Sequence, residues 1–538
     1  MKQHDVVVVG GGMAGLTAAA YLVRSGLDVL VCEKEAKPGG LVSSFERDGF
    51  TFDGGARAVE NSGIVLPMLR QLGIEVEFVP STVSIGIGAE LLRLTSGDSL
   101  ADYRALLERE FPQSRPDVIR IIAVIRKVMD YMDVLYGIDN PLFLDLKSDP
   151  SYVFKTILPW MLKYLLTMPK VARLTQPIDE YLASLTSNQA LIDIIDQHFF
   201  KKTPCFFALS YFSLYLDYLY PKGGTGVIPA KLGQYILSKG GNISCGMEIV
   251  AVDPGRHSLR DSGGAEHSYR KLIWAADQKT LYRILDATTL PVGAKRALVE
   301  ARQAVLADKK GGDSVYSLFL SLDIDRSYFA EVASAHLFYT PSRLGLSTVD
   351  LNELRLPAPA EGQYSLDRSR ILAWTRRYLE LTTYEISCPA LRDPDLAPEG
   401  KTGLIVSTLM EHSLHRHVST LGWYEEYRAF CRACIVEVLS AGIFPRLKAA
   451  VIQAFDSTPL TIERLTGNAD GAITGWAFTN DPQPAVHDLP AIAKSILTPI
   501  QDVLQAGQWT FSPAGLPISI LTGKLAADQA SKELAKAR

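Results

Sequence analysis

A glycine-rich turn between a buried strand and a helix, near the N-terminus, constrains this chain more than any other feature. Residues 5–9 are DVVVV, a continuous β-branched run of the kind that is buried on both faces of a parallel sheet. A G-x-G-x-x-G turn occupies residues 10–15, a helical pattern follows over 16–25, and residues 27–32 are the next expected strand. This order predicts a βαβ unit and therefore an α/β fold.

Each glycine of the turn has a mechanical role in binding a dinucleotide. Gly10 makes the tight turn, Gly12 lets the backbone approach a pyrophosphate, and Gly15 lets the helix and the strand pack closely. The helix N-terminus, at Met13 and Ala14, faces the phosphates. A glycine-rich turn that binds no ligand is the alternative interpretation.

Glu33 favours the dinucleotide site. It lies eighteen residues after Gly15, at the tip of the second expected strand, where an acid binds a ribose hydroxyl. An acid rather than an arginine at this position also argues against a 2′-phosphate, and hence against NADP.

Length and charge exclude several classes of protein. With 538 residues the chain predicts two or three packed units rather than one core. The net charge of −4 and the lack of a Lys/Arg-rich run give no indication of nucleic-acid binding. Only MKQH precedes the first strand, so no signal peptide is expected and the predicted location is the cytoplasm.

The six cysteines predict neither a disulfide framework nor a metal site. Cys431 and Cys434 form a CxxC pair inside the apolar helical pattern YRAFCRACIVEVL. We interpret them as buried core thiols, with redox or metal chemistry as the alternative.

Residues 33–55, EKEAKPGGLVSSFERDGFTFDGG, resemble the second FAD contact region of the flavin amine oxidase and phytoene desaturase class. The phrase FERDGFTFDGG is most similar to bacterial phytoene desaturases and carotenoid isomerases. The resemblance implies that Gly39 and Gly40 lie near the FAD phosphates, and Leu41 follows where the family often has arginine or serine. The other FAD contacts that this region implies are Lys34, Gly55 and Ala56.

Further segments extend the resemblance along the chain. YPKGGTGVIPAKL at 220–232 is similar to a family segment, and MEIVAVD at 247–253 resembles the strand whose backbone reaches the adenine. Segments 388–404 and 457–476 are similar to the carotenoid isomerase and retinol saturase branch. The FAD contacts implied by this part of the resemblance are Ile249, Val250, Ala276 and Asp277.

Residues 506–528, AGQWTFSPAGLPISILTGKLAAD, resemble the C-terminal FAD motif of the same family. In that motif a Gly-x-Pro turn opens a helix whose N-terminus faces the flavin ring and stabilises anionic reduced flavin. Gln508 and Ala514 depart from the usual acid and the usual glycine. The implied FAD contacts are Gly507, Gly515, Leu516, Pro517 and Ile518.

Pattern and resemblance together predict an α/β protein with a Rossmann-like FAD-binding domain assembled from both chain ends. A mixed α+β substrate domain and a helical, membrane-facing segment complete the expected fold. The predicted divisions are 1–84, 216–290 and 481–538 for FAD binding, 85–215 for the helical substrate and membrane-facing region, and 291–480 for substrate binding.

Residues 151–174 carry four basic residues and no acid. At 100° per residue these four fall within one arc of about 80°; they are Lys155, Lys163, Lys170 and Arg173. The opposite side is apolar and holds Phe154, Ile157, Trp160, Met161, Leu165, Met168 and Val171. No stretch reaches the roughly 18 apolar residues that spanning requires. The pattern therefore predicts a helix lying in a membrane interface, with a helix packed on its own domain as the alternative.

Residues 198–220 contain ten aromatic rings among 23 residues, counting His198. Such density is typical of a pocket wall for a long flat apolar ligand and equally of a buried core helix. His198 and Asp217 flank this segment, and we interpret both as structural. No His, Asp, Glu or Tyr has a spacing that identifies a catalytic acid or base, so none is predicted.

The resemblance implies an FAD-dependent oxidoreductase that desaturates, saturates or isomerises carbon–carbon bonds of a long apolar lipid by hydride exchange with the flavin. The lipid would be a carotenoid, an isoprenoid or an acyl chain. Since such a substrate has no polar handle, the flavin performs the chemistry and the protein supplies position and excludes water. One alternative is a flavin amine oxidase acting on a small soluble amine, and another is a flavin-containing carrier without turnover.

Overall fold

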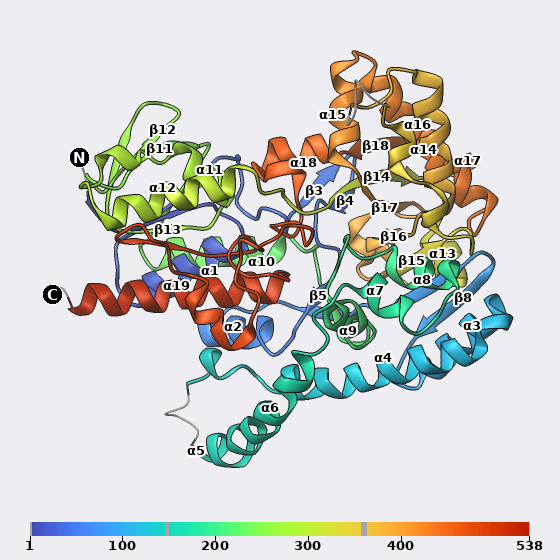
Figure 1. Cartoon of the computed structure of the whole chain (residues 1–538), viewed down its shortest axis with the longest axis horizontal. Coiled ribbons are helices and arrows are strands. Elements are labelled where there is room, and N and C mark those ends of the chain that lie inside the picture. The colour runs from blue at the N-terminus through green and yellow to red at the C-terminus, as the bar shows by residue number, and fades with distance from the viewer. Residues whose placement is uncertain (1–2, 146–149, 357–362, 537–538) are drawn as a thin grey trace.

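The computed structural model describes residues 3–145, 150–356 and 363–536 (Figure 1). Two seven-stranded sheets organise the chain, and each contains segments that are far apart in sequence. Two smaller sheets accompany them. One is the hairpin of β3 (Ser44–Arg47) and β4 (Phe50–Asp53), and the other has the order β5 (Val59–Glu60), β9 (Tyr218–Pro221), β6 (Phe78–Pro80).

The first sheet combines strands from the beginning, the middle and the end of the chain. Its order is β10-β2-β1-β13-β12-β11, and β19 also pairs with β13. The pairs of β1 with β2 and β13, of β2 with β10 and of β13 with β19 are parallel, whereas β11 and β12 are antiparallel. The bounds are β1 Gln3–Val9, β2 Val29–Glu33, β10 Asn242–Cys245, β11 Ile249–Asp253, β12 Ser258–Asp261, β13 Glu266–Trp274 and β19 Val503–Gln505.

Helices cover both faces of this sheet, which explains the continuous apolar run of β1. Val6 and Val8 pack with α1, α10 and α19, whereas Val7 and Val9 pack on the opposite face with α11 and α12. All four valines are buried, as a parallel strand between two helical layers requires. The bounds are α1 Met13–Arg24, α10 Val227–Ser238, α11 Gln278–Ile284, α12 Ala294–Ala307 and α19 Leu516–Lys536. The predicted α/β fold with a Rossmann-like unit is confirmed.

The second sheet has the order β18-β14-β17-β16-β15-β7-β8. β14, β16, β17 and β18 form antiparallel pairs, whereas β7 pairs in parallel with β15. The bounds are β7 Val83–Ile87, β8 Glu90–Leu94, β14 Ser314–Leu322, β15 His336–Thr340, β16 Tyr384–Ser387, β17 Thr402–Met410 and β18 Val451–Ser457.

The β7–β8 hairpin shows that the predicted helical character of residues 85–215 is wrong for the first ten positions. The partner of β7 is β15, which lies far later in the chain, so no local pattern reveals this pairing. After Leu94 the region is helical, as predicted. Its helices include α3 Ser99–Glu110, α4 Arg115–Tyr136, α6 Leu158–Val171, α7 Ile178–Ala183, α8 Gln189–Asp196 and α9 Cys205–Leu216.

A second layer of helices covers the sheet near β14 and β17. It consists of α14 (Arg368–Leu381), α15 (His412–Thr420) and α16 (Tyr424–Ala441). Cys431 and Cys434 lie on α16, are fully buried and form no disulfide. Burial raises the pKa of Cys434 to about 11, so the thiol stays protonated. The interpretation of this CxxC pair as core thiols is confirmed.

α6 lies at the edge of the molecule beside α4, with the short helix α5 (Pro150–Tyr152) and a π-helical turn (Val153–Ile157) before it (Figure 1). The predicted helix is present, but its apolar side is divided. Trp160 and Val171 face α4, and the indole Nε1 of Trp160 donates to Val134 O at 2.5 Å. None of the helices in the described ranges combines the length and hydrophobicity of a membrane span.

Candidate functional site

The glycine turn between β1 and α1 is shaped by backbone packing. Gly10 has φ +102°, and a Cβ there would lie 2.7 Å from Ala275 O. A Cβ on Gly15 would overlap the carbonyl oxygen of Gly10. At Gly12, by contrast, a Cβ would meet nothing within 4 Å. Gly10 and Gly15 are therefore required by the fold itself, whereas the surface of Gly12 is open.

The open surface lies at the N-terminus of α1. The first hydrogen bond within the helix runs from Leu16 N to Gly12 O at 2.9 Å, so the amides of Met13, Ala14 and Gly15 have no acceptor inside the helix. Amides at a helix N-terminus favour an anion, because they are donors at the positive end of the helix dipole. The turn therefore fits a pyrophosphate.

The glycine pair predicted near the phosphates lies against this turn. Gly39 N donates to Gly11 O at 2.8 Å, and both glycines of the pair have positive φ, +141° at Gly39 and +58° at Gly40. A Cβ on Gly40 would lie 3.2 Å from the Cα of Gly12. The loop then continues to Leu41. The pair therefore forms a second glycine wall beside the phosphate turn.

Leu41 joins this loop to the DGG segment. Ala56 N donates to Leu41 O at 2.9 Å, and a Cβ on Gly55 would overlap the same oxygen. The position where the family often has a polar side chain thus contributes its backbone carbonyl. Gly55 and Ala56 therefore lie against Leu41, the residue that follows the glycine pair.

Glu33 is held at the tip of β2 by two amides. Its Oε2 accepts from Gly11 N at 2.7 Å and its Oε1 from Glu35 N at 2.8 Å. Burial raises the pKa of the carboxyl, and the two amide hydrogen bonds counteract that shift. Next to it, Lys34 Nζ donates to Arg464 O at 2.6 Å. The carboxylate is thus fixed beside the phosphate turn.

The segment predicted to reach the adenine contacts the tip of β2 two residues before β11 begins. Met247 N donates to Glu33 O at 2.8 Å, so Met247 is the residue that reaches the tip of β2. Ile249 is buried in the core under the sheet, and the side chain of Val250 is exposed. Met247 is the first residue of the segment predicted to reach the adenine, and its contact with Glu33 depends on the pairing of β10 with β2.

Ala276 and Asp277 follow β13 on the other side of the phosphate turn. Asp277 caps α11, where its Oδ1 accepts from Thr280 N at 2.6 Å. Its Oδ2 accepts from Ala469 N at 2.9 Å. The buried carboxylate therefore anchors the loop after α18 (Pro459–Thr466) to the first sheet.

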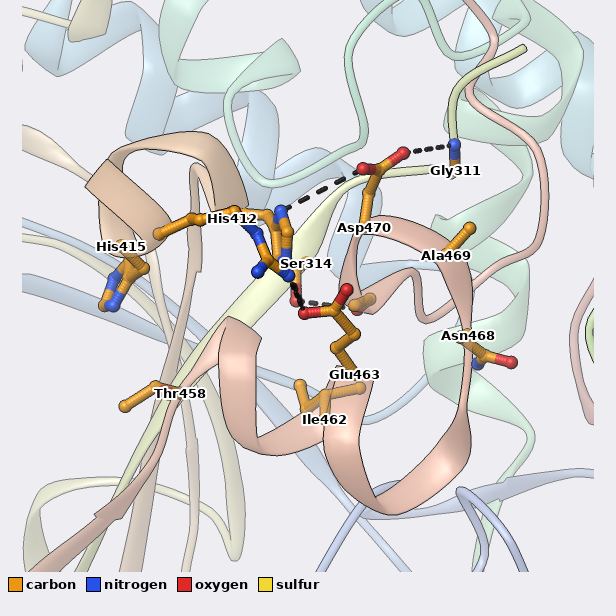
Figure 2. A network of polar contacts seen from close by, with 12 residues as sticks. Gly311, Ser314, His412, His415, Thr458, Ile462, Glu463, Asn468, Ala469 and Asp470 are labelled. Atoms are coloured by element: carbon orange, nitrogen blue, oxygen red, sulfur yellow. Dashed lines mark hydrogen bonds and ion pairs between the residues drawn. The ribbon is translucent and has the colours of Figure 1, made fainter. Parts of the chain in front are cut away.

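That loop is braced by a polar network, which Figure 2 shows. Asp470 Oδ2 accepts from Gly311 N at 2.8 Å, and Ser314 Oγ donates to Gly471 O at 2.7 Å. His412 on α15 lies 2.9 Å from a carboxylate oxygen of Glu463 on α18. The segment that resembles the carotenoid isomerase branch therefore connects Asp277 with the second sheet.

The C-terminal motif comes to the phosphate helix through close packing. A Cβ on Gly523 of α19 would overlap Ala14 O, and a Cβ on Gly507 would lie 3.2 Å from the Cβ of Ala14. Gly507 N donates to Thr522 Oγ1 at 2.9 Å. Both chain ends therefore border the same space.

The N-terminus of α19 is open like that of α1. Ser519 N donates to Gly515 O at 3.0 Å, so Leu516 and Ile518 have amides without an acceptor inside the helix, and Pro517 has no N–H. The atoms nearest to a Cβ on Gly515 are Glu60 Oε2 and Pro517 Cδ, each at 3.9 Å.

Beyond Gly55 the site becomes a buried polar core that no motif identified. Asp53 accepts hydrogen bonds from Tyr220 Oη, from Thr225 N and from Ser44 Oγ, each at 2.8 Å. Arg57 is buried, and its guanidinium donates to Asp53 O at 3.0 Å. This core connects the DGG loop with the segment at 220–232.

Arg57 also reaches the second sheet. Its Nη2 donates to Ser407 Oγ at 2.7 Å and to Ser317 Oγ at 3.1 Å. Arg392 lies beside it, donates to Arg57 O at 2.8 Å and stacks over the ring of Tyr220 at 3.9 Å. The charges of Asp53 and Arg57 in the short phrase DGGARAVE were the available sequence signal for this core.

An apolar cavity of about 20 Å³ lies between α9, α3 and the β7–β15 pair. Its apolar lining includes Ile85, Ile87, Tyr103, Ile194, Tyr215 and Phe338. His198 also lines it, and burial lowers the pKa of this imidazole to about 4. Much of the aromatic segment 198–220 is core, as the second interpretation states, and Tyr215 and His198 also border the small cavity.

Aromatic rings continue from this cavity toward the DGG loop. Tyr215 and Phe338 have ring centres 4.8 Å apart, Tyr215 and Tyr218 5.7 Å, and Tyr218 and His336 5.4 Å. His336 Nε2 lies 3.0 Å from Glu385 Oε1 on the neighbouring strand. The apolar region thus ends in polar side chains near Arg57 and Glu60.

The comparisons with known proteins agree with this geometry. The family model of an NAD(P)-binding Rossmann-like domain matches residues 8–72. The 4,4'-diapophytoene desaturase of Staphylococcus aureus is 23% identical over 550 residues, covering 98% of this chain and 99% of that protein. The chloroplastic prolycopene isomerase of Daucus carota is 22% identical over 491 residues, covering 87% and 71%. This chain is a flavoprotein oxidoreductase that is similar to the phytoene desaturase class along nearly its whole length.

A third relative is similar over a shorter part. The inactive all-trans-retinol 13,14-reductase of Danio rerio is 29% identical over 268 residues, which cover 46% of this chain and 42% of that protein. The chain therefore spans less than half the length of that relative, but nearly the full length of the diapophytoene desaturase.

Solved structures show the same fold. An oxidoreductase from Methanosarcina mazei has a TM-score of 0.62 at 14% identity, covering 98% of this chain and 99% of that one. A triple mutant of putrescine oxidase has a TM-score of 0.60 at 14% identity, covering 99% of each chain. At this identity the likeness concerns the fold alone. FAD is the cofactor that the Rossmann-like unit and the desaturase relatives indicate together.

Proposed function

We propose that this chain adds or removes hydrogen at carbon–carbon bonds of a long apolar lipid, with isomerisation of a polyene as a variant of the same chemistry. The observation that supports it most directly is the aromatic series that runs from the apolar cavity to the DGG loop. The relatives named for a carotenoid desaturase and a carotenoid isomerase support the substrate class.

We propose further that FAD lies along the space bordered by both chain ends. The α1 N-terminus at Gly12 would hold the pyrophosphate, Glu33 and Met247 the adenosine, and the α19 N-terminus at Gly515 the flavin ring. The division of the chain into three FAD-binding segments and two substrate segments belongs to this proposal. When bound, FAD supplies the two-electron chemistry that an apolar hydrocarbon lacks.

The residues on the substrate side would position the lipid and exclude water. The cavity itself has room for about one water molecule, so a lipid would occupy this region by separating the rings of Tyr215 and Phe338. Arg57 and Arg392 would hold the DGG loop against the second sheet, because their guanidinium groups donate to carbonyls of the loop and that of Arg57 also donates to a serine of the sheet.

We also propose that α6 rests on a membrane from which the lipid enters. One row of apolar side chains on this helix is exposed: Phe154, Leu158, Met161, Leu162, Leu165 and Leu166. Lys155, Lys163, Lys170 and Arg173 are exposed as well. An exposed apolar row beside a basic row is typical of an interfacial helix. The faces differ from the predicted ones, because α4 occupies the side with Trp160.

The proposed function can be tested on purified protein. Lipids extracted from it should include a polyene or isoprenoid, identified by mass. Diapophytoene in liposomes, mixed anaerobically with the oxidised holoenzyme, should bleach the flavin, or should reoxidise the photoreduced enzyme if the net reaction is saturation. Bleaching by putrescine and not by lipids would favour the amine oxidase alternative. No redox change with either would favour a carrier.

A further inference from the structure

Glu60 is an acid at the junction of the flavin motif and the aromatic series. It lies on β5, opposite Tyr218 on β9. Its Oε2 is 3.9 Å from the position of a Cβ on Gly515, at the N-terminus of α19. The side chain is partly exposed. One carboxylate therefore borders both the end of the flavin motif and the end of the apolar region.

The surroundings of Glu60 are phenols and another acid. Tyr218 hydrogen bonds to its carboxylate, and the phenols of Tyr136, Tyr211 and Tyr215 interact with its charge. The charge that acts on Glu60 is that of Asp217, which accepts hydrogen bonds from the Asn61 and Ser62 amides. Burial and this second acid raise the pKa of Glu60 to about 7. Its carboxyl therefore exchanges a proton near neutral pH.

Other acids near the site are committed to structural bonds. Glu385 Oε1 lies 3.0 Å from His336 Nε2, and this contact, with the charges of Arg57 and Arg392, lowers the pKa of the Glu385 carboxyl. Asp53 accepts hydrogen bonds from Tyr220, Thr225 and Ser44. A base that takes a proton from a hydrocarbon needs an oxygen that borders the substrate space and a pKa near the working pH, and Glu60 combines both properties.

We propose that Glu60 is the catalytic residue that accepts the substrate proton in desaturation and donates it in the reverse direction. This inference rests on the proposed function. Desaturation breaks two C–H bonds on neighbouring carbons. One hydrogen leaves with its electron pair to the flavin, and the other leaves as a proton to the Glu60 carboxylate. The electron pair of the second C–H bond becomes the new C=C bond, so atoms and charges balance.

The test compares wild-type holoenzyme with Glu60→Gln, Glu60→Asp and Asp217→Asn, each mixed anaerobically with diapophytoene in liposomes. Flavin reduction by wild type should rise with pH around 7, because the proton acceptor must be ionised. Glu60→Gln should slow this step on the order of 10²–10⁴-fold while flavin content and lipid binding stay unchanged. Glu60→Asp should retain part of the rate.

Asp217→Asn keeps the inference testable if Glu60→Gln fails to fold. It removes the neighbouring acid, so the pH profile should shift to lower pH with its maximal rate preserved. Wild type that shows no redox change with the lipid in either flavin state would contradict the proposed function, and Glu60 with it. Two outcomes would contradict the role of Glu60 alone. In one, the lipid reduces the flavin of Glu60→Gln at a rate within threefold of wild type. In the other, Asp217→Asn leaves the pH profile of flavin reduction unshifted.

Discussion

The phosphate half of the site is built from backbone, whereas the substrate half is built from side chains. At Gly12, Gly39 and Gly40 the walls are amides and α-carbons, and any side chain would narrow the space. Around Arg57 and Tyr215 the walls are long side chains contributed by strands and helices from distant parts of the chain. The first kind of site tolerates little substitution, and the second can be reshaped to suit another ligand.

The sharpest test of the backbone half is a contrast between two glycines. Gly12→Val should abolish FAD binding and leave the stability of the flavin-free protein unchanged, because its side chain would enter only the open surface. Gly15→Ala should instead destabilise the flavin-free protein, because its Cβ overlaps Gly10 O. Flavin absorbance of the purified variants and urea unfolding separate the two effects. Tight FAD binding by Gly12→Val would disprove the proposed pyrophosphate position.

This contrast also explains how far the sequence could predict the site. Gly10, Gly12, Gly15 and Glu33 act within one βαβ unit, so their spacing carries the information. The second glycine pair came from the resemblance, and its packing against the turn agrees with the implied place. Local spacing was sufficient where the contacts are local.

The substrate half could not be predicted in the same way. Arg57 acquires its partners only when β14 and β17 come beside it, and Glu60 only when α19 arrives from the C-terminus. The β7–β8 hairpin was missed for the same reason, because its partner β15 is distant. On α6 the helix was predictable, but the side occupied by α4 was not.

Arg57 provides the corresponding test of the side-chain half. Arg57→Ala should lower the free energy of unfolding by about 3 kcal/mol, because it leaves Ser317, Ser407 and the loop carbonyls without their buried donor. Urea unfolding of the flavin-free protein measures this value. Arg47→Ala is the control, since Arg47 ends β3 of the preceding hairpin and is exposed, where it stacks over Phe455, and it should change stability by less than about 1 kcal/mol. Equal effects of the two substitutions would mean that the buried core around Arg57 contributes little.

A buried histidine in the helical layer that covers the second sheet should give the protein an acid sensitivity. His415 on α15 is fully buried, and burial lowers the pKa of its imidazole to about 3. Below the ordinary histidine pKa, the unfolded chain therefore binds a proton at His415, whereas the folded chain does not bind it. Its contribution to stability is complete above pH 6.5 and is lost as the pH falls toward 3, by about 2 kcal/mol between pH 6.5 and 5.

His415→Gln should reduce that loss, measured as the difference between the free energies of unfolding at pH 7 and pH 5. His487→Gln, at an exposed position, is the control substitution. An unchanged pH dependence in His415→Gln would show that other groups cause the acid sensitivity.

The smallest expected effect per residue is on membrane binding through α6, the helix of the substrate half that we propose rests on the membrane. Each basic residue near an anionic surface contributes about 1 kcal/mol, and salt screens this attraction. Wild type should therefore sediment with anionic liposomes at low salt and less at high salt. A variant with Lys155, Lys163, Lys170 and Arg173 changed to Glu should stay in solution and keep its FAD.

Leu162→Ser with Leu166→Ser should weaken binding at both salt concentrations, because these exposed side chains contribute through burial in the lipid. In a control variant, Lys295 and Arg296 on α12 are changed to Glu. This variant carries half of the charge change, at a place away from α6, and it should bind liposomes like wild type. Equal binding by all variants, or none by wild type, would leave α6 as a helix packed on α4.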